Sequence, residues 1–196
     1  MSDPSGDNLP APGQEEGRLI HLAARGDARA CRTLVDQHLP QVLRLAARLL
    51  GERSEAEDVA QESFVRLWGE LPRWRGQARV ATWLYQVATR LCLDRLRRRR
   101  ETSLDEVPEP QDLRLHADDA HQRRQTRELL ERALSRLPPR QRAAVTLVHD
   151  QELTQYEAAA VLEISVDALE SLLRRARGAL RQELAPLRQE LLEDRS

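Results

Sequence analysis

Apolar residues recur three and four positions apart along most of this chain, and no segment of useful length alternates between apolar and polar residues. Such spacing is typical of amphipathic helices rather than of β-strands. Aromatic residues make up only 3% of the 196 residues, so leucine, alanine and valine have to build the core. These small aliphatic residues favour helices over a sheet, which prefers aromatic and β-branched side chains. The sequence therefore predicts an all-α fold.

Charge and proline content divide the chain into four segments. Residues 1–17 hold four acids, no basic residue and six prolines or glycines, and we expect a disordered tail there. Residues 18–100 carry 17 arginines against 9 acids, whereas residues 101–120 carry seven acids, one arginine and two prolines. Helical spacing returns over residues 121–196. The sequence thus predicts two small helical domains, 18–100 and 121–196, joined by a flexible acidic linker.

Several classes of protein are excluded or disfavoured by what the sequence does not contain. No apolar run approaches the roughly 20 residues of a membrane span, and the first residues lack the basic and apolar parts of an export signal. Cys31 and Cys92 are too few for a disulfide framework and form no metal-binding pair, so we expect two buried thiols in a reducing cytoplasm. No phosphate-binding loop, zinc-protease motif or nucleophile elbow occurs. We therefore expect a cytoplasmic protein without membrane insertion that is not an enzyme and needs no metal or cofactor.

Residues 154–177 have the spacing of a helix-turn-helix. Thr154 and Glu157 form a capping box before the first helix, and Ser165 can cap the second after a three-residue turn. Arg174, Arg175 and other arginines follow on the second helix, where they suit phosphate contacts. Many alanine-rich helix pairs are only structural, so both interpretations stay open.

Residues 73–100 hold nine arginines and a single acid, Asp94. Trp74, Trp83 and Tyr85 stand among these arginines, a combination that suits stacking on unpaired bases while the backbone phosphates are neutralised. The alternatives are that Trp83 belongs to the core and that the arginine run 97–100 is a solvated helix end. A charge this concentrated nevertheless favours a polyanionic partner, most plausibly nucleic acid.

Residues 55–68 begin with acids, which are ordinary near a helix N-terminus. Yet Asp58, Gln61 and Glu62 fall at i, i+3 and i+4, so they form one polar face. That face could dock a basic helix of a partner protein. The spacing alone does not decide between the two interpretations.

Taken in order, these segments resemble the extracytoplasmic-function (ECF) class of bacterial RNA polymerase sigma factors, from about residue 19 to residue 184. The Glu-Ala-Glu-Asp-x-x-Gln-Glu-x-Phe run over 55–64 is similar to the family's core-polymerase-binding helix. The segments 74–79 and 82–85 resemble its promoter-melting loop and minus-ten helix, and Leu-Asp-Arg-Leu-Arg-Arg over 93–98 matches the end of that helix. Leu-x-x-Leu-Pro-x-x-Gln-Arg over 134–142 resembles the start of its second domain.

The resemblance implies roles for three sets of residues. Contact with the polymerase core would involve Asp58, Gln61 and Glu62. Minus-ten DNA binding and melting would involve Arg73, Trp74, Arg75, Gln77, Arg79, Trp83, Arg90, Arg97 and Arg98. Minus-thirty-five DNA binding would involve Ser165, Asp167, Glu170, Ser171, Arg174, Arg175 and Arg177.

This sequence also departs from the family's pattern at four positions. Arg90 stands where the family commonly has Asn, and Glu163 stands where the turn has Gly. Glu170 and Leu172 occupy positions that are often basic, and a glutamate repels phosphate but can accept a hydrogen bond from cytosine. We therefore expect an unusual minus-thirty-five preference.

As partners, the resemblance implies the clamp and flap of core RNA polymerase, promoter DNA and an anti-sigma factor that restrains a stress-responsive initiator. Two alternatives remain. One is a stand-alone helix-turn-helix regulator, and the other is a sigma-like decoy that titrates an anti-sigma factor. The basic, aromatic segment 73–100 favours a sigma factor, because neither alternative needs to melt DNA.

Overall fold

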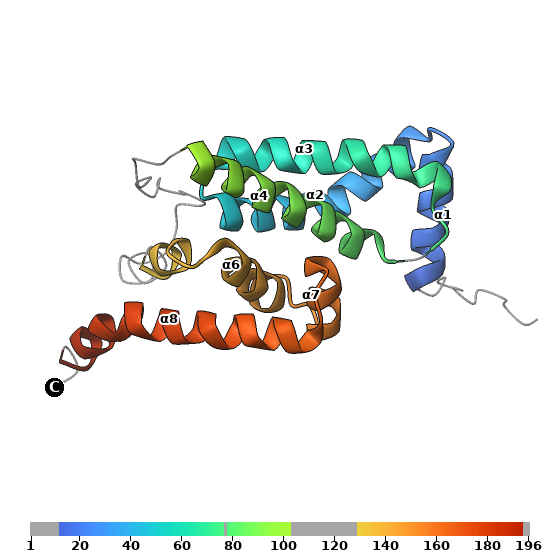
Figure 1. Ribbon diagram of the computed structural model, residues 1–196. Coiled ribbons are helices and arrows are strands. Elements are labelled where there is room, and N and C mark those ends of the chain that lie inside the picture. Colours follow the sequence, from blue (N-terminus) through green and yellow to red (C-terminus); the bar gives the residue numbers. More distant parts are fainter. Residues whose placement is uncertain (1–11, 77, 103–128, 194–196) are drawn as a thin grey trace, which may run out of the picture.

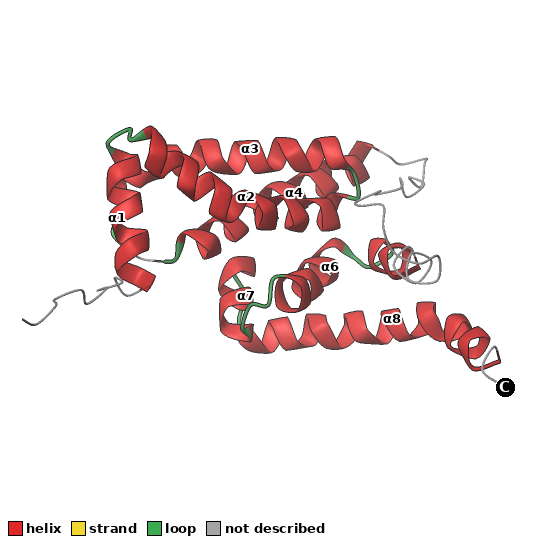
Figure 2. Ribbon diagram, turned by 180° about the vertical axis from the view of Figure 1, so that it is seen from behind, coloured by secondary structure: helices red, strands yellow, loops and turns green. Residues whose placement is uncertain are grey.

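The computed structural model describes residues 12–76, 78–102 and 129–193. In its first half, α2 (Ala28–Leu50), α3 (Arg53–Glu70) and α4 (Val80–Thr102) pack against one another, and α1 (Pro12–Ala24) lies across one end (Figure 1). A 3-10 turn, η1 (Leu71–Arg73), and a loop connect α3 to α4. Within the described ranges every regular element is a helix, as Figure 2 shows, and the all-α prediction is confirmed.

Helix α1 begins at Pro12, so residues 12–17 of the predicted tail are helical. Proline fits the first turn of a helix, because the amide it lacks would have no intrahelical partner there. Glu15 also lies in the first turn, where the helix dipole favours an acid. Buried Ile20 and Ala23 then fix the helix to the rest of the first half. Residues 1–11 of the tail prediction lie outside the described residues.

Local capping signals explain where two of these helices begin and end. An Asp before an apolar helical stretch and a Gly after it predict the two caps of α2. Both caps form, because the Asp27 carboxylate accepts a hydrogen bond from the Ala30 amide at 2.8 Å and Gly51 ends the helix with φ 74°. The Ser-x-x-Glu spacing of Ser54 and Glu57 predicts a capping box at the start of α3, and this prediction is wrong. Glu52 caps α3 instead, because its carboxylate already accepts from the Ser54 amide at 3.2 Å.

The described part of the second half consists of helical residues 129–135, α6 (Pro139–Val145), the π-helical turn η2 (Thr146–Asp150), α7 (Gln155–Leu162) and α8 (Val166–Glu193). Both α6 and α7 pack on α8 (Figure 1). A proline inside a helix is expected to break or kink it, but α8 continues as a helix through Pro186.

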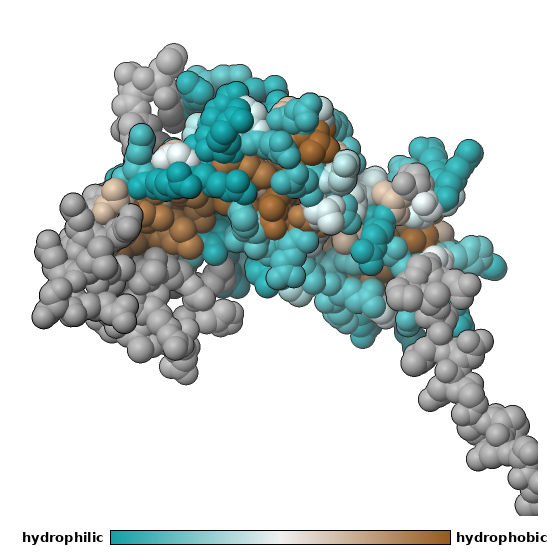
Figure 3. All heavy atoms as spheres, turned by 90° about the horizontal axis from the view of Figure 1, so that it is seen from below, coloured by the Kyte–Doolittle hydropathy of each residue, from teal (hydrophilic) through white to brown (hydrophobic). Residues whose placement is uncertain are grey.

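The two halves pack against each other in one body, with α4 against α7 and α6, and α2 against η2. Fully buried leucines, among them Leu34, Leu49 and Leu84 in the first half and Leu147 and Leu169 in the second, belong to one continuous apolar cluster. Seen from below, apolar side chains gather in bands between hydrophilic ones (Figure 3). Most of the predicted acidic linker, from residue 103 on, lies outside the described residues.

Among the helices that the structure describes, none is both long and apolar enough to span a bilayer. The two cysteines are free thiols; Cys92 is buried and Cys31 only half-buried, whereas the sequence suggests burial of both. Burial raises the pKa of Cys92 to about 12, so this thiol stays protonated at neutral pH.

Candidate nucleic-acid interface

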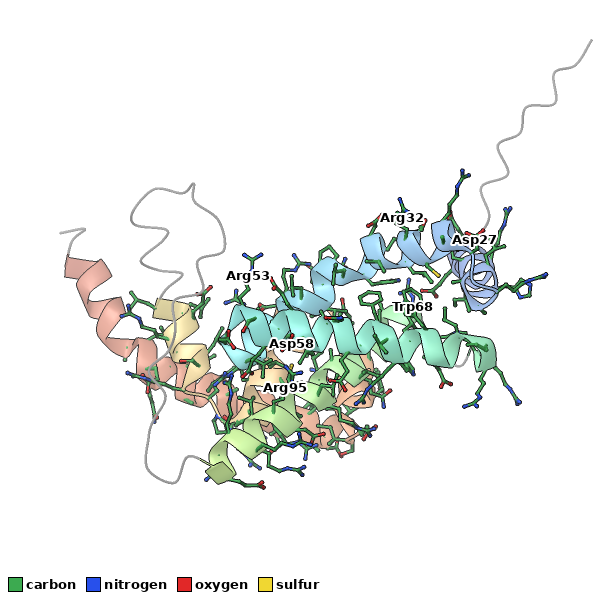
Figure 4. The ribbon with its side chains drawn as sticks, turned by 90° about the horizontal axis from the view of Figure 1, so that it is seen from above. Asp27, Arg32, Arg53, Asp58, Trp68 and Arg95 are labelled. Atoms are coloured by element: carbon green, nitrogen blue, oxygen red, sulfur yellow. The ribbon has the colours of Figure 1, made fainter. Side chains whose placement is uncertain are left out.

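The arginines of α4 divide between two faces of the helix. On the face toward α3, Arg95 donates to the Glu55 carbonyl at 2.9 Å and lies 4.0 Å from the Asp58 carboxylate and 3.8 Å from that of Glu62. Arg99 pairs with the Glu55 carboxylate. Figure 4 shows Arg95 beside Asp58. These two arginines therefore hold α4 against α3 and are engaged within the fold.

The outward face of α4 carries the arginines that the sequence assigns to DNA. Arg90, Arg97 and Arg98 are exposed there. Arg97 lies 3.3 Å from the Asp94 carboxylate, an i,i+3 pair on the helix surface. The pairing of Arg97 with Asp94 on the surface agrees with the interpretation of this run as a solvated helix end. The exposed arginines also form a positive surface, which binding to a phosphate backbone requires.

The loop before α4 brings two indoles together. The ring centroids of Trp74 and Trp83 are 6.0 Å apart at an interplanar angle of 70°, an edge-to-face contact. Both side chains are half-buried at the edge of the core. Trp83 can therefore pack on the core with one part of its ring and still offer another part for stacking on a base. The indole nitrogen of Trp74 is buried with no hydrogen-bond partner among the described residues.

The remaining minus-ten candidates surround this indole pair. Arg73, Arg75 and Arg79 are exposed, and Gly76 turns the loop with φ 74°, a conformation that favours glycine. Gln77 lies outside the described residues. The loop thus combines an aromatic surface at the core's edge with exposed positive charge.

The three residues assigned to the polymerase core lie on α3, where Asp58 and Glu62 also face Arg95 of α4. Asp58 and Gln61 are exposed, and Glu62 is bound by Arg66 at 2.6 Å. Val65 follows Gln61 by four residues and is 61% exposed, which is unusual for a valine. Sequence reasoning missed Val65. The sequence does contain an indication of it, because Val65 is an apolar residue placed one helical turn after Gln61 on the same polar face.

The helix-turn-helix forms as predicted. The Thr154 amide donates to the Glu157 carboxylate at 2.9 Å, and the Glu157 amide donates to the Thr154 hydroxyl at 3.3 Å, which completes the capping box. Hydrogen bonds from Thr154 lower the pKa of Glu157. Glu163 makes the turn in the left-handed conformation, with φ 54°, and the Ser165 hydroxyl accepts from the Ala168 amide at 3.2 Å.

By their spacing, either Leu172 or Leu173 could face the core from α8. The structure buries Leu173, together with Leu169 and Ala176, and leaves Leu172 half-buried. Ser171 is half-buried, and its hydroxyl accepts from Arg175 at 3.0 Å. The other minus-thirty-five candidates are exposed: Ser165, Asp167, Glu170, Arg174, Arg175 and Arg177. These residues are therefore accessible on the surface of the helix-turn-helix.

Two residues that depart from the ECF pattern meet in space. Glu163 accepts hydrogen bonds from Arg90 at 2.7 and 2.8 Å through its two carboxylate oxygens, and from the Gln86 amide at 2.7 Å. Hydrogen bonds from Arg90 and Gln86 lower the pKa of Glu163. Nothing in the local spacing of either motif indicates this contact, because the partners are 73 and 77 residues apart.

Arg142 makes a second link between the halves. Its guanidinium is buried, donates to the Leu49 carbonyl near the end of α2 at 2.8 Å, and also binds the carbonyls of Ser135 and Leu137. Burial lowers its pKa. Nearby, Arg48 lies 3.0 Å from the Asp150 carboxylate. Sequence reasoning placed Arg142 only in a motif and gave it no role.

Comparisons with known proteins agree with this arrangement. Residues 34–102 match the family model of Sigma-70 region 2, and residues 127–180 match that of Sigma-70, region 4. The chain is 30% identical over 181 residues to the ECF RNA polymerase sigma factor SigW of Bacillus subtilis, covering 87% of this chain and 97% of the relative. It is 36% identical over 183 residues to the ECF RNA polymerase sigma factor SigE of Mycolicibacterium smegmatis, covering 89% of this chain and 70% of the relative.

Solved structures also share the fold. CnrH in complex with the cytosolic domain of CnrY matches with a TM-score of 0.65 and 27% identity, over 87% of this chain and 97% of that chain. The sigma factor RpoE in complex with the anti-sigma factor NepR from Bartonella quintana matches with a TM-score of 0.63. At 19% identity, over 79% of this chain and 96% of that chain, the second match concerns the fold alone.

Proposed function

Because the chain belongs to the ECF class of RNA polymerase sigma factors, we propose that it binds core RNA polymerase and directs promoter recognition, strand opening and transcription initiation. The observation that carries this proposal is the order of three surfaces along one chain. The polar face of α3 comes first, the arginine- and indole-bearing loop with α4 follows, and the helix-turn-helix comes last. A protein that only docks on duplex DNA has no need of the middle surface.

For the minus-ten element, the proposed reader is the loop at 73–79 with the outward side of α4. Flipping a base out of the stack costs a few kcal/mol, and stacking on an aromatic side chain returns about 1–3 kcal/mol per base. The balance is near zero, so opening needs favourable base steps and the bound polymerase. Trp74 and Trp83 supply the aromatic surface, while Arg73, Arg75 and Arg79 neutralise the strand.

For the minus-thirty-five element, α8 is proposed to enter the major groove with its exposed side. Arg174, Arg175 and Arg177 would contact phosphates and base edges. Glu170 would disfavour phosphate and can accept from a cytosine amine, so it shifts the sequence preference. Domains 18–100 and 121–196 would together hold both promoter elements.

The face of α3 with Asp58, Gln61 and Glu62 is proposed to dock on the polymerase clamp, and the second domain on the flap. Restraint by an anti-sigma factor in a stress response, and a cytoplasmic location, follow from the same proposal. The solved relative from Bartonella quintana was crystallised with an anti-sigma factor. The chain itself supplies binding and strand separation, not bond chemistry.

Run-off transcription with core polymerase on a genomic library tests the proposal. We expect discrete transcripts that require this chain. Equal transcription by core polymerase without the chain would refute the sigma-factor role, and duplex binding without any polymerase effect would favour a stand-alone regulator. Capture of an anti-sigma factor with no transcription at all would favour the decoy.

Trp74→Ala tests the melting role within that assay. We expect it to reduce promoter opening, measured by permanganate reactivity of unpaired thymines, more than it reduces binding of the polymerase complex to closed duplex. Trp74→Phe should retain part of the opening, because it keeps an aromatic face. Trp68→Ala is the matched control, since Trp68 packs on Phe64 within α3 at 5.9 Å. Equal losses in binding and opening for Trp74→Ala would contradict base capture.

A further inference from the structure

In this structure, α7 of the second half covers part of the outward side of α4 (Figures 1 and 2). Gln86 and Arg90 are four residues apart and therefore share one side of α4. Both donate to the same carboxylate, that of Glu163 at the end of α7. The amide and guanidinium that face outward from α4 are thus engaged by the second half of the chain.

Near the start of α7, Glu157 is within electrostatic range of Arg79, the last residue before α4. The positive charge of Arg79 contributes to the lowered pKa of Glu157, after the larger effect of the hydrogen bonds from Thr154. Glu157 lies in the first turn of α7 and Glu163 follows its last residue, and between these two positions α7 packs on α4. The Glu163 pair is therefore one part of a wider packing contact between the two helices.

The chemistry of the Glu163 contact resembles that of a nucleic-acid contact. One guanidinium nitrogen of Arg90, Nη2, donates to both carboxylate oxygens of Glu163, and a guanidinium donates in the same way to the anionic oxygens of a phosphate. Arg90 cannot make both contacts at once. The pair is also reversible, because the side chains of Arg90 and Glu163 are 60% and 49% exposed and water competes for them.

The backbone supports a specific role for the Glu163 side chain. Glu163 has φ 54°, a left-handed conformation that a glycine adopts without strain. A glycine there would make the same turn and lose the contact with α4. Glu152 offers a comparison within the same chain, because it is an exposed glutamate that also has φ 54°.

We propose that α7 and Glu163 form an intramolecular latch that closes over the base-reading side of α4, so that Arg90 becomes available to DNA only when α7 moves away from α4. This inference rests on the proposed function for what α4 reads, while the closure itself is a property of the free chain. At the far end of the interface, Arg142 still joins the halves through the Leu49 carbonyl. Opening therefore occurs at the α7 end.

Single-molecule energy transfer in the free chain tests the closure. Fluorophores are attached to Ala28→Cys and Ala160→Cys, two exposed positions in α2 and α7, in a Cys31→Ser background. Glu163→Gly should raise the ratio of open to closed molecules about threefold to fivefold, the size expected for a doubly bonded but partly exposed ion pair. Glu163→Asn, which keeps the preference for this turn, should act in the same direction.

Glu152→Gly is the matched control, since it removes one negative charge and relieves the same backbone strain without touching α4. It should leave the ratio unchanged. The double variant Arg90→Glu with Glu163→Arg should restore the closed population that each single change reduces. An open fraction that is equal in Glu163→Gly and Glu152→Gly would overturn the latch.

Binding of short single-stranded deoxyoligonucleotides of mixed sequence tests what the latch covers. The apparent Kd should fall in Glu163→Gly by the same factor by which the open fraction rises, because only open molecules bind. Opening without a gain in affinity would overturn the claim that the latch masks the reading side. If Glu163→Gly opens the free chain as expected but run-off transcription never requires the chain, the proposed function is refuted while the closure of α7 over α4 still stands.

Discussion

Replacing Arg142 with methionine tests how the two halves are joined. Arg142 is a buried cation whose described partners are three backbone carbonyls, those of Leu49, Ser135 and Leu137. The Leu49 carbonyl belongs to the last turn of α2, where carbonyls carry the negative end of the helix dipole. Methionine keeps an unbranched apolar stem but removes every donor.

The magnitude follows from these contacts. A hydrogen bond that involves a charged group contributes about 1.5–3 kcal/mol, so the loss of two good ones amounts to about 3–6 kcal/mol. Removing a cation from the interior relieves a desolvation penalty of several kcal/mol, which offsets part of this loss. We expect a net loss of about 2–3 kcal/mol, a large share of the roughly 5–15 kcal/mol of a typical domain.

Urea unfolding followed by two probes measures the effect. Trp68, Trp74 and Trp83 all lie in the first half, so tryptophan fluorescence follows that half alone, whereas far-ultraviolet circular dichroism follows both. The two curves should coincide in the unchanged chain and separate in Arg142→Met, with circular dichroism changing first.

Arg140→Met is the control, because Arg140 is exposed on the same helix and donates to the Leu162 carbonyl at a long 3.3 Å. We expect a loss below about 0.5 kcal/mol for this change. If Arg142→Met and Arg140→Met cost the same, or if the two probes still coincide in Arg142→Met, the reasoning about a buried link is refuted.

Two further predictions concern pH and capping. Burial lowers the pKa of His38 below its ordinary 6.5. As the pH falls, the unfolded chain therefore takes up this proton at a higher pH than the folded chain does. The stability that the neutral imidazole provides above pH 6.5 is then lost as the pH falls toward the lowered pKa. His38→Gln should flatten the fall of Tm between about pH 7 and pH 5, and a slope equal to that of the unchanged chain would argue against the buried imidazole. Thr154→Ala should destabilise the protein by about 1 kcal/mol in urea unfolding, because it removes the cap of α7. Gln155→Ala should cost less, and equal costs would contradict the capping argument.

Local signals in the sequence were sufficient for most helix boundaries. Asp27, Gly51 and Thr154 each act on backbone groups within four residues, so their types and spacing predict the cap directly. The failure at Ser54 has the same origin. In a capping box the Glu57 carboxylate would accept from the Ser54 amide. Glu52 stands only two residues before Ser54, and its carboxylate accepts from that amide instead.

The links between the halves could not be predicted in this way. Arg142 meets a backbone carbonyl 93 residues away, and a carbonyl is present at every position of the sequence. Glu163 and Arg90 were each noticeable as departures from a family pattern, but neither spacing nor charge indicates that they depart together. Pairings of this kind depend on how complete helices pack against one another. The periodicity of residues within one helix does not encode that packing.

The exclusive use of arginine connects these observations. All 31 basic residues are arginine, and α4 shows how a uniform set of cations acquires different roles. Arg95 and Arg99 face the acids of α3 and hold the fold, while Arg90 faces outward and meets Glu163. Because a guanidinium binds carboxylates and phosphates with the same geometry, the position of each acid decides which arginines stay available to DNA. In this chain the acids of α3 hold Arg95 and Arg99 within the first half, and the acid at the end of α7 holds Arg90 across the two halves.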